Sequence, residues 1–230
     1  MKFLCVIPAR YGSKRVKFKN LKKINGKPLV YWTLNFADKI KKFDKIVISS
    51  DSKKITKIAN QFKNIDQILR PTAIAKDNTD MTEVVNHVLD YYKRKNLFYD
   101  AVVILQPTSP FRKIQTINKA IKFFKKTKPD LVVSAIKVDA KSNSQNLFKL
   151  SKKKYTKNFK YNVGNNKNNE YKLDGGVVFI KKIKNRLSSI IDGNTIFIEV
   201  FFPEALDIDT EYDFEIAKLL MENEIEKNKN

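Results

Sequence analysis

The sequence contains little cysteine and histidine, and this scarcity excludes several kinds of site. Among its 230 residues there is one cysteine, Cys5, and one histidine, His87. A disulfide scaffold, a cysteine-rich zinc site and a metal site built from several histidines are therefore excluded. A Ser-His-Asp triad could use only His87. We expect Cys5 to be a small buried side chain inside the first strand and His87 to pack on the flank of a helix, and neither to take part in catalysis.

Long apolar stretches are absent as well. No run of residues approaches the roughly 20 apolar positions that a membrane-spanning helix needs. The apolar run from Phe3 to Ile7 is too short for a signal peptide, so we expect a cytoplasmic protein without a membrane partner. Apolar residues make up 42% of the chain and aromatic residues 11%, and they occur in runs. Both features favour a folded domain with a sizeable core over disorder.

Acidic residues are outnumbered by basic ones. The chain has 46 Lys and Arg against 24 Asp and Glu, a net charge of +22, but only six of the basic residues are Arg. Proteins that read nucleic acids use Arg for bidentate contacts, and no basic stripe with interleaved aromatics is present. We therefore prefer a solvated basic surface to a specific nucleic-acid interface, with a basic nucleic-acid-binding domain as the alternative. The positive field favours a polyanionic substrate such as a nucleoside triphosphate.

Predicted strands and helices alternate over the first 138 residues. The apolar runs predict strands at Lys2–Pro8, Lys45–Ser50, Gln67–Arg70, Ala101–Leu105 and Leu131–Val138. Helical periodicity and capping patterns predict helices at Pro28–Ile40, Ser52–Gln61, Asp80–Tyr92 and Ile114–Phe124. This alternation predicts an α/β fold, a Rossmann-like, mostly parallel sheet with helices on both faces.

The pattern breaks after Val138. Residues 139–172 are polar and rich in Lys and Asn, with scattered aromatics, so they form either a disordered insertion or an arm that orders against a partner subunit. Strands are then predicted at Gly175–Ile180 and Thr195–Phe201, with a short helix at Lys182–Ser189 between them. Thr210 is the expected cap of a last helix. We expect one domain over residues 1–230, with 139–172 as an excursion.

A basic loop follows the first predicted strand. Ligands of open α/β sheets bind beyond the carboxyl ends of the strands, so this is a favourable place for a site. Gly12 permits close approach of the backbone, and Arg10, Lys14 and Lys19 can offset phosphate charge. No Gly-Lys-Ser/Thr opens a helix here, so the loop is not a Walker P-loop. The alternative is a solvated turn.

Two further segments carry polar chemistry. The turn after the fourth predicted strand, Gln106–Arg112, has two prolines, and Gln106 and the hydroxyls offer neutral hydrogen bonds; the alternative is a rigid turn that caps a helix. Asp207 and Asp209 lie two positions apart, so in extended backbone their carboxylates face the same side. In a basic protein such a pair predicts a Mg²⁺ site. The alternative is a helix cap at Glu211.

These segments, in their order along the chain, closely resemble the motifs of the acylneuraminate cytidylyltransferases, also called CMP-sialic acid synthetases. The resemblance covers nearly the whole chain apart from residues 139–172. The related Kdo cytidylyltransferases are less similar, because they carry an acidic Gly-Asp-Glu-Pro motif where this chain has Gln106–Pro110. The matching segments are Ile7–Arg15, Lys19–Leu21, Gly26–Leu29, Ser49–Asp51, Leu69–Pro71, Leu105–Arg112 and Asp207–Glu211.

The resemblance implies a nucleotidyltransferase-type fold and the transfer of CMP from CTP to the anomeric hydroxyl of a nonulosonic, sialic-acid-like sugar acid. Pyrophosphate would leave after a Mg²⁺-assisted in-line attack on the α-phosphate. It also implies a homodimer in which the 139–172 arm reaches the neighbouring active site. A nucleotidyltransferase that uses another sugar or another nucleoside triphosphate is the alternative within enzymes.

The same resemblance implies roles for individual residues. Catalytic roles fall on Arg10, Lys14, Lys19 and Asp209, metal binding on Asp207 and Asp209, and sugar-acid binding on Gln106 and Phe179. The nucleotide-binding set is Ala9, Arg10, Gly12, Ser13, Lys14, Lys19, Asn20 and Arg70.

Two segments depart from the family pattern. Leu173-Asp174-Gly175-Gly176 stands where sialic acid synthetases commonly have Arg-Pro-Asn-Gly, and the missing Arg would have faced the sugar. Legionaminic, pseudaminic and other nonulosonic acids therefore stay open as acceptors. The segment from Asp77 to Thr82 also differs from the small hydroxyl residues expected near cytosine, which leaves the contacts to the base unassigned.

Overall fold

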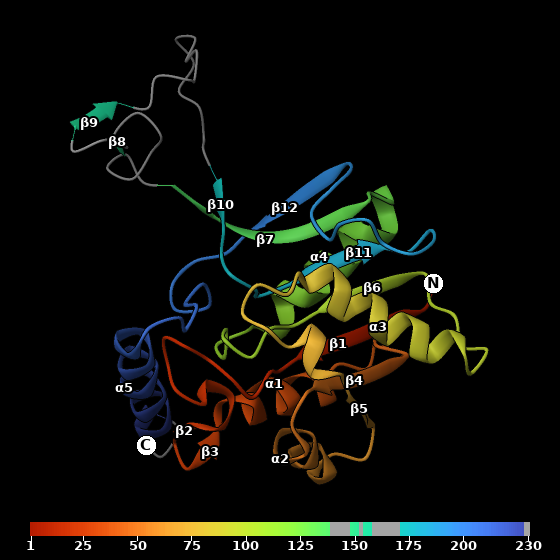
Figure 1. The fold of residues 1–230 in the computed structure, drawn as a ribbon, viewed down its shortest axis with the longest axis horizontal. Helices are drawn as coiled ribbons and strands as arrows, with labels where there is room; N and C mark the ends of the chain where they lie inside the picture. Colours follow the sequence, from red (N-terminus) through yellow and green to blue (C-terminus); the bar gives the residue numbers. More distant parts are fainter. Residues whose placement is uncertain (139–147, 152–153, 158–170, 228–230) are drawn as a thin grey trace.

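One mixed β-sheet forms the centre of the molecule in the computed structural model, which describes residues 1–138, 148–151, 154–157 and 171–227 (Figure 1). The strand order is β10-β7-β11-β6-β1-β4-β5, and β12 also pairs with β7. The strands are β1 (Phe3–Pro8), β4 (Lys45–Ser50), β5 (Ile65–Leu69), β6 (Ala101–Ile104), β7 (Leu131–Lys137), β10 (Tyr171–Leu173), β11 (Phe179–Lys182) and β12 (Thr195–Glu199).

Most strand pairs of this sheet are parallel, as the sequence pattern predicted. β1 pairs in parallel with β4 and with β6, β4 with β5, and β7 with β12. β11 lies antiparallel between β6 and β7, and β10 pairs antiparallel with β7. The strand predicted from Gly175 begins only at Phe179, because Gly175 and Gly176 adopt positive φ values of 92° and 153° and interrupt the extended backbone.

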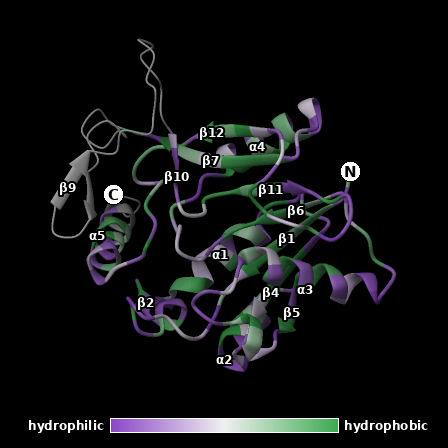
Figure 2. Ribbon diagram, turned by 45° about the horizontal axis from the view of Figure 1, so that its top comes forward, coloured by the Kyte–Doolittle hydropathy of each residue, from purple (hydrophilic) through white to green (hydrophobic). Residues whose placement is uncertain are grey.

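Helices cover both faces of the sheet. They are α1 (Leu29–Asp38), α2 (Lys53–Thr56), α3 (Met81–Lys93), α4 (Ile114–Thr127) and α5 (Glu211–Lys227), with 3₁₀ turns η1 (Lys19–Leu21), η2 (Lys57–Gln61) and η3 (Thr72–Ile74). Alternate residues of β1 point to opposite faces: Phe3 and Cys5 join α1 and α4 in one apolar cluster, and Leu4 and Val6 join α3 in another. Figure 2 shows the resulting hydrophobic strands inside a more hydrophilic exterior.

Cys5 is fully buried, as expected, and this burial raises the pKa of its thiol well above the ordinary value. The thiol therefore stays protonated at neutral pH, in keeping with a packing role.

A third apolar cluster holds α5 against the loop that follows β1. Phe214 and Ile208 pack on Val16, Ile24 and Leu29, and a small hairpin of β2 (Lys23–Ile24) and β3 (Lys27–Pro28) lies in the same region. This packing brings the segment before α5 next to the basic loop, although about 190 positions separate them in the sequence.

Other predictions had mixed outcomes. The Asp80 cap is confirmed, because its side chain accepts a hydrogen bond from the Thr82 N–H. The short helix predicted at Lys182–Ser189 is wrong: only its first residue belongs to an element, the end of β11, and the rest forms bends. Asn86 on α3 supplies both backbone hydrogen bonds of Leu187, so this segment follows the surface of α3 instead of coiling.

The predicted excursion lies mainly outside the described residues, which omit 139–147, 152–153 and 158–170. Within it, β8 (Phe148–Ser151) and β9 (Lys154–Lys157) form a separate two-stranded antiparallel sheet. β10 starts at Tyr171, so the last two residues of the predicted excursion belong to the main sheet. No helix in the part of the chain that the structure describes has the length and apolar character that a membrane crossing requires.

Candidate active site

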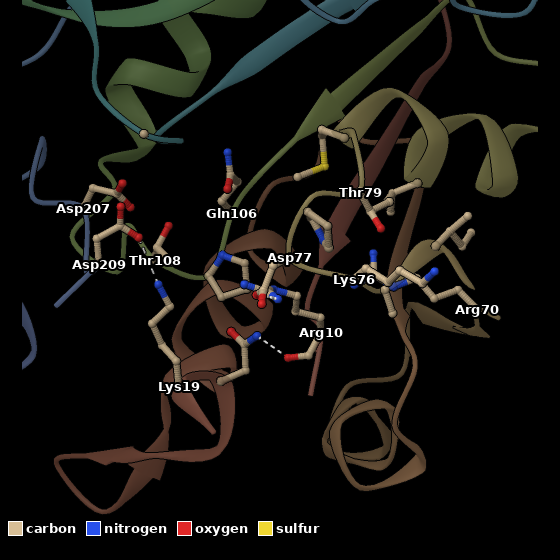
Figure 3. Close-up of a pocket in the computed structure, with 18 residues that line it drawn as sticks. Arg10, Lys19, Arg70, Lys76, Asp77, Thr79, Gln106, Thr108, Asp207 and Asp209 are labelled. Atoms are coloured by element: carbon tan, nitrogen blue, oxygen red, sulfur yellow. Dashed lines mark hydrogen bonds and ion pairs between the residues drawn. The ribbon is translucent and has the colours of Figure 1, made fainter. Parts of the chain in front are cut away.

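A cavity of about 380 Å³ opens at the carboxyl ends of β1, β5 and β6. Arg10 follows β1, Arg70 follows β5 and Gln106 follows β6, while Asp207 and Asp209 come from the segment before α5. Figure 3 shows Arg70 at one end, the two carboxylates at the other, and Arg10 and Gln106 between them. The structure thus brings together residues that the sequence placed in four separate motifs.

The basic loop is anchored from several sides. The Tyr11 N–H donates to the Asp51 carboxylate at 2.7 Å, and the Asn20 amide donates to the Arg10 carbonyl at 2.8 Å. Asn20 is buried, and among the described residues its Oδ1 atom has no hydrogen-bond partner. These contacts fix the backbone at Arg10, so its guanidinium enters the cavity from a defined position.

Lys19 connects the basic loop to the acidic segment. Its Nζ atom lies 2.6 Å from the carbonyl oxygen of Ile208 and 3.2 Å from the Asp209 carboxylate. Arg15 reaches the other oxygen of Asp209 at 2.9 Å. Asp209 therefore has two cationic neighbours, one of which, Lys19, has a side chain only 12% exposed.

Asp207 lies in a different environment from Asp209. Burial raises the pKa of its carboxyl above the ordinary value, against the opposing effect of the Thr108 hydroxyl. Its Oδ1 atom is buried without a hydrogen-bond partner among the described residues. The cap of α5 uses Thr210 and Asp213 instead, since the Thr210 hydroxyl accepts from the Asp213 N–H. The helix-cap alternative thus does not account for the carboxylate pair.

The Asp207–Asp209 pair suits a divalent cation. Carboxylate oxygens are hard donors, and Mg²⁺ is held by one or two carboxylates together with substrate phosphates. Within the described ranges, no group of three or more His, Cys, Asp or Glu side chains is placed so that it could hold a metal ion. A cation here would consequently complete its coordination with other oxygens, such as those of water or substrate phosphates.

Arg70 closes the opposite end of the cavity. Its backbone N–H donates to the Ser50 carbonyl at 2.8 Å, which continues the pairing of β5 with β4. The side chain is 5% exposed, and burial lowers the pKa of its guanidinium while Asp51 acts against this effect. A buried guanidinium of this kind can form directional hydrogen bonds to a bound base.

Asp77 is a site residue that the motifs did not identify. Its carboxylate accepts hydrogen bonds from Arg10 and, at 3.0 Å, from Lys14. Hydrogen bonds from these two bases lower the pKa of Asp77 below its ordinary value. Lys76, Thr79 and Met81 also line the cavity. The resemblance placed the segment from Asp77 to Thr82 near the cytosine but gave no role to its individual residues.

Gln106 and Phe179 share a side pocket of about 200 Å³ that adjoins the main cavity at Met81 and Gln106. Its walls include Ile104, Ile190 and Ile191. Three polar residues around it accept hydrogen bonds from backbone N–H groups: Asp80 from Thr82, Thr82 from Ile190 and Ser189 from Ile191. The side-chain amide of Gln106 has no hydrogen bond within the described part of the chain.

Arg112 does not face the cavity, although it belongs to the same motif as Gln106. Its guanidinium is buried and donates to the backbone carbonyls of Gln106, Ser109, Gly176 and Val177. Burial lowers the pKa of Arg112 to about 10, so it stays charged at neutral pH. It ties the Gln106 turn to the segment between β10 and β11.

Four residues of the predicted nucleotide-binding set lie outside the lining of the cavity. Ala9 is buried and its N–H donates to the Ser49 carbonyl at 2.9 Å. Lys14 is 83% exposed and reaches the cavity only through Asp77. A Cβ atom added at Gly12 would meet no other atom within 4 Å, so the surroundings of Gly12 are open. Ser13 completes this group, and the other four members line the cavity.

The sequence is similar to known cytidylyltransferases along almost its whole length. A family model described as Cytidylyltransferase matches residues 4–228. The chain is 34% identical to the CMP-N,N'-diacetyllegionaminic acid synthase of Legionella pneumophila, over 96% of this chain and 97% of that protein. It is 30% identical to the N-acylneuraminate cytidylyltransferase of Escherichia coli, over 94% of this chain and 51% of that protein.

Among solved structures, the chain is similar to a CMP:2-keto-3-deoxy-manno-octonic acid synthetase complexed with CTP. The TM-score is 0.71 at 17% identity, and the match covers 97% of this chain and 100% of that one. At this identity the likeness shows the fold alone.

Proposed function

The chain belongs to the cytidylyltransferase family, and from this membership we propose that it transfers CMP from CTP to the anomeric hydroxyl of a nonulosonic sugar acid. Pyrophosphate is the second product. The observation that carries the proposal is the single cavity in which Arg10, Lys19 and Arg70 lie together with Asp207 and Asp209. Cations for a triphosphate and carboxylates for a metal ion thus meet within one site.

The nucleotide would lie along the basic side of the cavity. Arg10, Lys14 and Lys19 would bind the triphosphate, with the backbone of Ala9, Gly12 and Ser13 shaping the loop. Asn20 would contact the ribose, and the buried guanidinium of Arg70 would contact the cytosine. The α-phosphate would then lie between Lys19 and the acidic pair, since Lys19 already lies within 3.2 Å of Asp209.

Mg²⁺ would be held by Asp207 and Asp209. The buried, unpartnered Oδ1 atom of Asp207 fits this role, because a buried carboxylate oxygen needs a hydrogen bond or a cation. When bound, Mg²⁺ supplies charge neutralisation to the phosphates of CTP. Lys19 would then exchange Asp209 for a phosphate oxygen, so that its ammonium group keeps an anionic partner.

The reaction itself requires positioning more than covalent help from the protein. The anomeric hydroxyl gives its proton to solvent and its oxygen attacks the α-phosphorus in line with the α–β bridging oxygen. The bond from the α-phosphorus to that bridging oxygen breaks as pyrophosphate leaves. Arg10 and Lys19 offset the charge that develops on the phosphoryl oxygens. Holding both substrates in one cavity converts a bimolecular reaction into one between neighbouring groups.

The acceptor would occupy the side pocket with Gln106 and Phe179. The pocket offers apolar walls and one unengaged amide, so it suits an acyl or methyl substituent better than a row of hydroxyls. The name of the Legionella relative describes an acid with two acetyl groups. We therefore place N-acylated nonulosonic acids first among the acceptors to be tested.

Pyrophosphate release provides the test. Purified protein with Mg²⁺ and CTP is offered N-acetylneuraminic, di-N-acetyllegionaminic, pseudaminic and Kdo acids in parallel, with UTP and GTP as donor controls. We expect release with CTP and one of the N-acylated acids. Release with UTP or GTP but not CTP would contradict the proposal, and so would protein that binds no CTP.

A further inference from the structure

We propose that Asp77 is an internal substitute for a phosphate group, which a bound anion must displace, and that it thereby sets the affinity of the site for CTP and pyrophosphate. This proposal rests on the proposed function, because it concerns the same basic loop. It assigns a role to a residue in the segment where the chain departs from the motifs of its family.

The first support is the position of the carboxylate. One oxygen of Asp77 accepts from the Arg10 guanidinium, and the other lies 3.0 Å from the Lys14 ammonium. A phosphate group would engage both bases through the same kind of contact, an anionic oxygen accepting charge-assisted hydrogen bonds. Figure 3 shows Asp77 beside Arg10 in the middle of the cavity, between Arg70 and the acidic pair.

The second support is that Arg10 and Asp77 are held differently. The backbone of Arg10 is fixed through Asn20 and through the neighbouring Tyr11 N–H, which bonds to Asp51. Asp77 lies in the segment 71–80, in which no residue is buried. A segment with few buried contacts moves at low cost, so the carboxylate can leave while the base stays in place.

The third support is a matching arrangement at the other end of the cavity. Lys19 and Arg15 pair with Asp209 there, as Arg10 and Lys14 pair with Asp77 here. If a metal ion binds Asp209 and Lys19 moves away, the positive charge of the ion replaces that of Lys19 as the partner of the carboxylate. Asp77 is not part of the proposed metal site, so displacing it leaves an anion near the incoming triphosphate. Asp77 therefore opposes binding of any anion at Arg10 and Lys14.

The opposing effect has a consequence for both ends of the reaction. CTP and pyrophosphate would each compete with Asp77 for the same two bases. Weaker binding of CTP is the cost, and faster departure of pyrophosphate is the gain. The side chain of Asp77 is 33% exposed, so solvent screens the competition and the effect stays modest.

The test compares Asp77→Asn and Asp77→Ala with wild type by calorimetric titration of CTP and, separately, pyrophosphate, in EDTA and low salt without acceptor. Because the variants lose the ion pairs of Asp77 with Arg10 and Lys14, which are partly exposed, we expect the Kd of both ligands to fall about three- to tenfold. The gain should shrink at high salt, because screening weakens the competition. Glu83→Gln is the matched control: it removes one exposed negative charge six positions along the chain and should leave both affinities unchanged.

Other results overturn the proposal in distinguishable ways. If wild type binds CTP and the Asp77 variants bind it equally or more weakly, Asp77 either has no effect on CTP binding or contributes to it. The proposed function then stands without this inference. An equal fall in Kd for Glu83→Gln would show that the effect comes from the net charge of the protein and not from the position of Asp77. If wild type binds neither CTP nor pyrophosphate in EDTA, the titrations are repeated with Mg²⁺, and absence of binding there as well would remove the proposed function and this proposal together.

Discussion

Asp207 and Asp209 lie in one motif, but their surroundings differ. Burial raises the pKa of Asp207 and leaves one of its oxygens unpartnered, whereas Asp209 is paired with Lys19 and Arg15. Neither serves as the cap of α5, a role that Thr210 and Asp213 fill. The pair is therefore available to a cation and a substrate.

Replacing Asp209 by Asn tests this interpretation at the level of one residue. The amide keeps the shape but removes the negative charge, so we expect turnover to fall at least about a hundredfold, as when a group that offsets transition-state charge is removed. Thermal unfolding should change little, because the side chain is 38% exposed. Steady-state rates as a function of Mg²⁺ concentration are the measurement.

Glu211→Gln is the control, because Glu211 lies two positions away and pairs with Lys22 rather than with the cavity. Turnover within about twofold of wild type is expected for it. Unchanged, Mg²⁺-dependent turnover in Asp209→Asn would exclude Asp209 as a metal ligand.

Residues that follow strands were predictable, and those that reach the site through loop geometry were not. Arg10 and Gln106 were singled out because they follow predicted strands, and Asp209 because it lies two positions from Asp207; all three line the cavity. Asp77 contacts Arg10 across 67 positions and lies in a segment without periodicity, so the sequence contained no signal for the contact. Arg112 is the opposite case: it lies in a motif, but the motif did not indicate that its guanidinium binds backbone carbonyls instead of facing the cavity.

At the scale of elements, residues 174–178 between β10 and β11, called the bulge below, pack against both the acidic pair and Gln106. Asp174 accepts hydrogen bonds from the N–H groups of Gly176 and Val177, while Arg112 donates to their carbonyls. A Cβ atom on Gly175 would lie 2.1 Å from Oδ2 of Asp207, and one on Gly176 would lie 2.7 Å from Cβ of Gln106. Because the two glycines have no side chains, Asp207 and Gln106 can approach the backbone here.

Substitution of these two glycines should therefore affect different kinetic constants. We expect Gly176→Ala to raise KM for the acceptor about tenfold or more with little change for CTP, since displacement of a positioning group by about 1 Å can cost two orders of magnitude. Gly175→Ala should instead lower kcat and weaken the response to Mg²⁺. Initial rates with each substrate varied in turn provide the measurement.

Gly193→Ala is a control for strain alone. Gly193 also has a positive φ, 79°, and its added Cβ would meet Asp130 at 2.6 Å, away from the cavity. It should lower the melting temperature and leave both KM values unchanged. If the three variants differ only in stability, the bulge has no positioning role.

The fold was predictable where apolar periodicity was strong. β1, β4, β6 and β7 and their helices follow from runs of buried residues that α1, α3 and α4 cover. The segment 182–189 was mistaken for a helix because its backbone bonds to distant elements: Leu187 bonds to Asn86 on α3, and the N–H groups of Lys182 and Ile183 donate to the carbonyls of Asp130 and Asp100. Such tertiary hydrogen bonds replace local ones and leave no periodic trace in the sequence.

At the scale of the whole molecule, the domain and subunit predictions remain predictions. A single domain over 1–230 with an arm at 139–172 follows from the motif order, but most of that arm lies outside the described residues. The net charge of +22 likewise says only that anionic substrates are attracted. The described surface beside the arm offers a more specific argument.

Exposed apolar side chains lie on β10 and β12, which both pair with β7, and shortly after β12 in the sequence. Tyr171 on β10 stacks on Phe197 of β12 with ring centroids 6.3 Å apart, and Phe197 is 52% exposed. Leu173, Phe201 and Phe202 are also exposed nearby in the sequence. Exposed aromatic residues grouped in this way are typical of subunit interfaces, so we expect a second copy of the chain to cover them.

Sedimentation of wild type and Phe197→Glu tests the homodimer. Wild type should sediment as a dimer at micromolar concentration, and Phe197→Glu should shift toward monomer, because a carboxylate buried without a partner is costly. Phe98→Glu is the control, since Phe98 is 63% exposed and lies at the turn between α3 and β6. A monomeric wild type, or a Phe197→Glu variant as dimeric as Phe98→Glu, would place the interface elsewhere or remove it. Loss of turnover together with dimerisation, while CTP binding persists, would further indicate that each acceptor site depends on the neighbouring subunit.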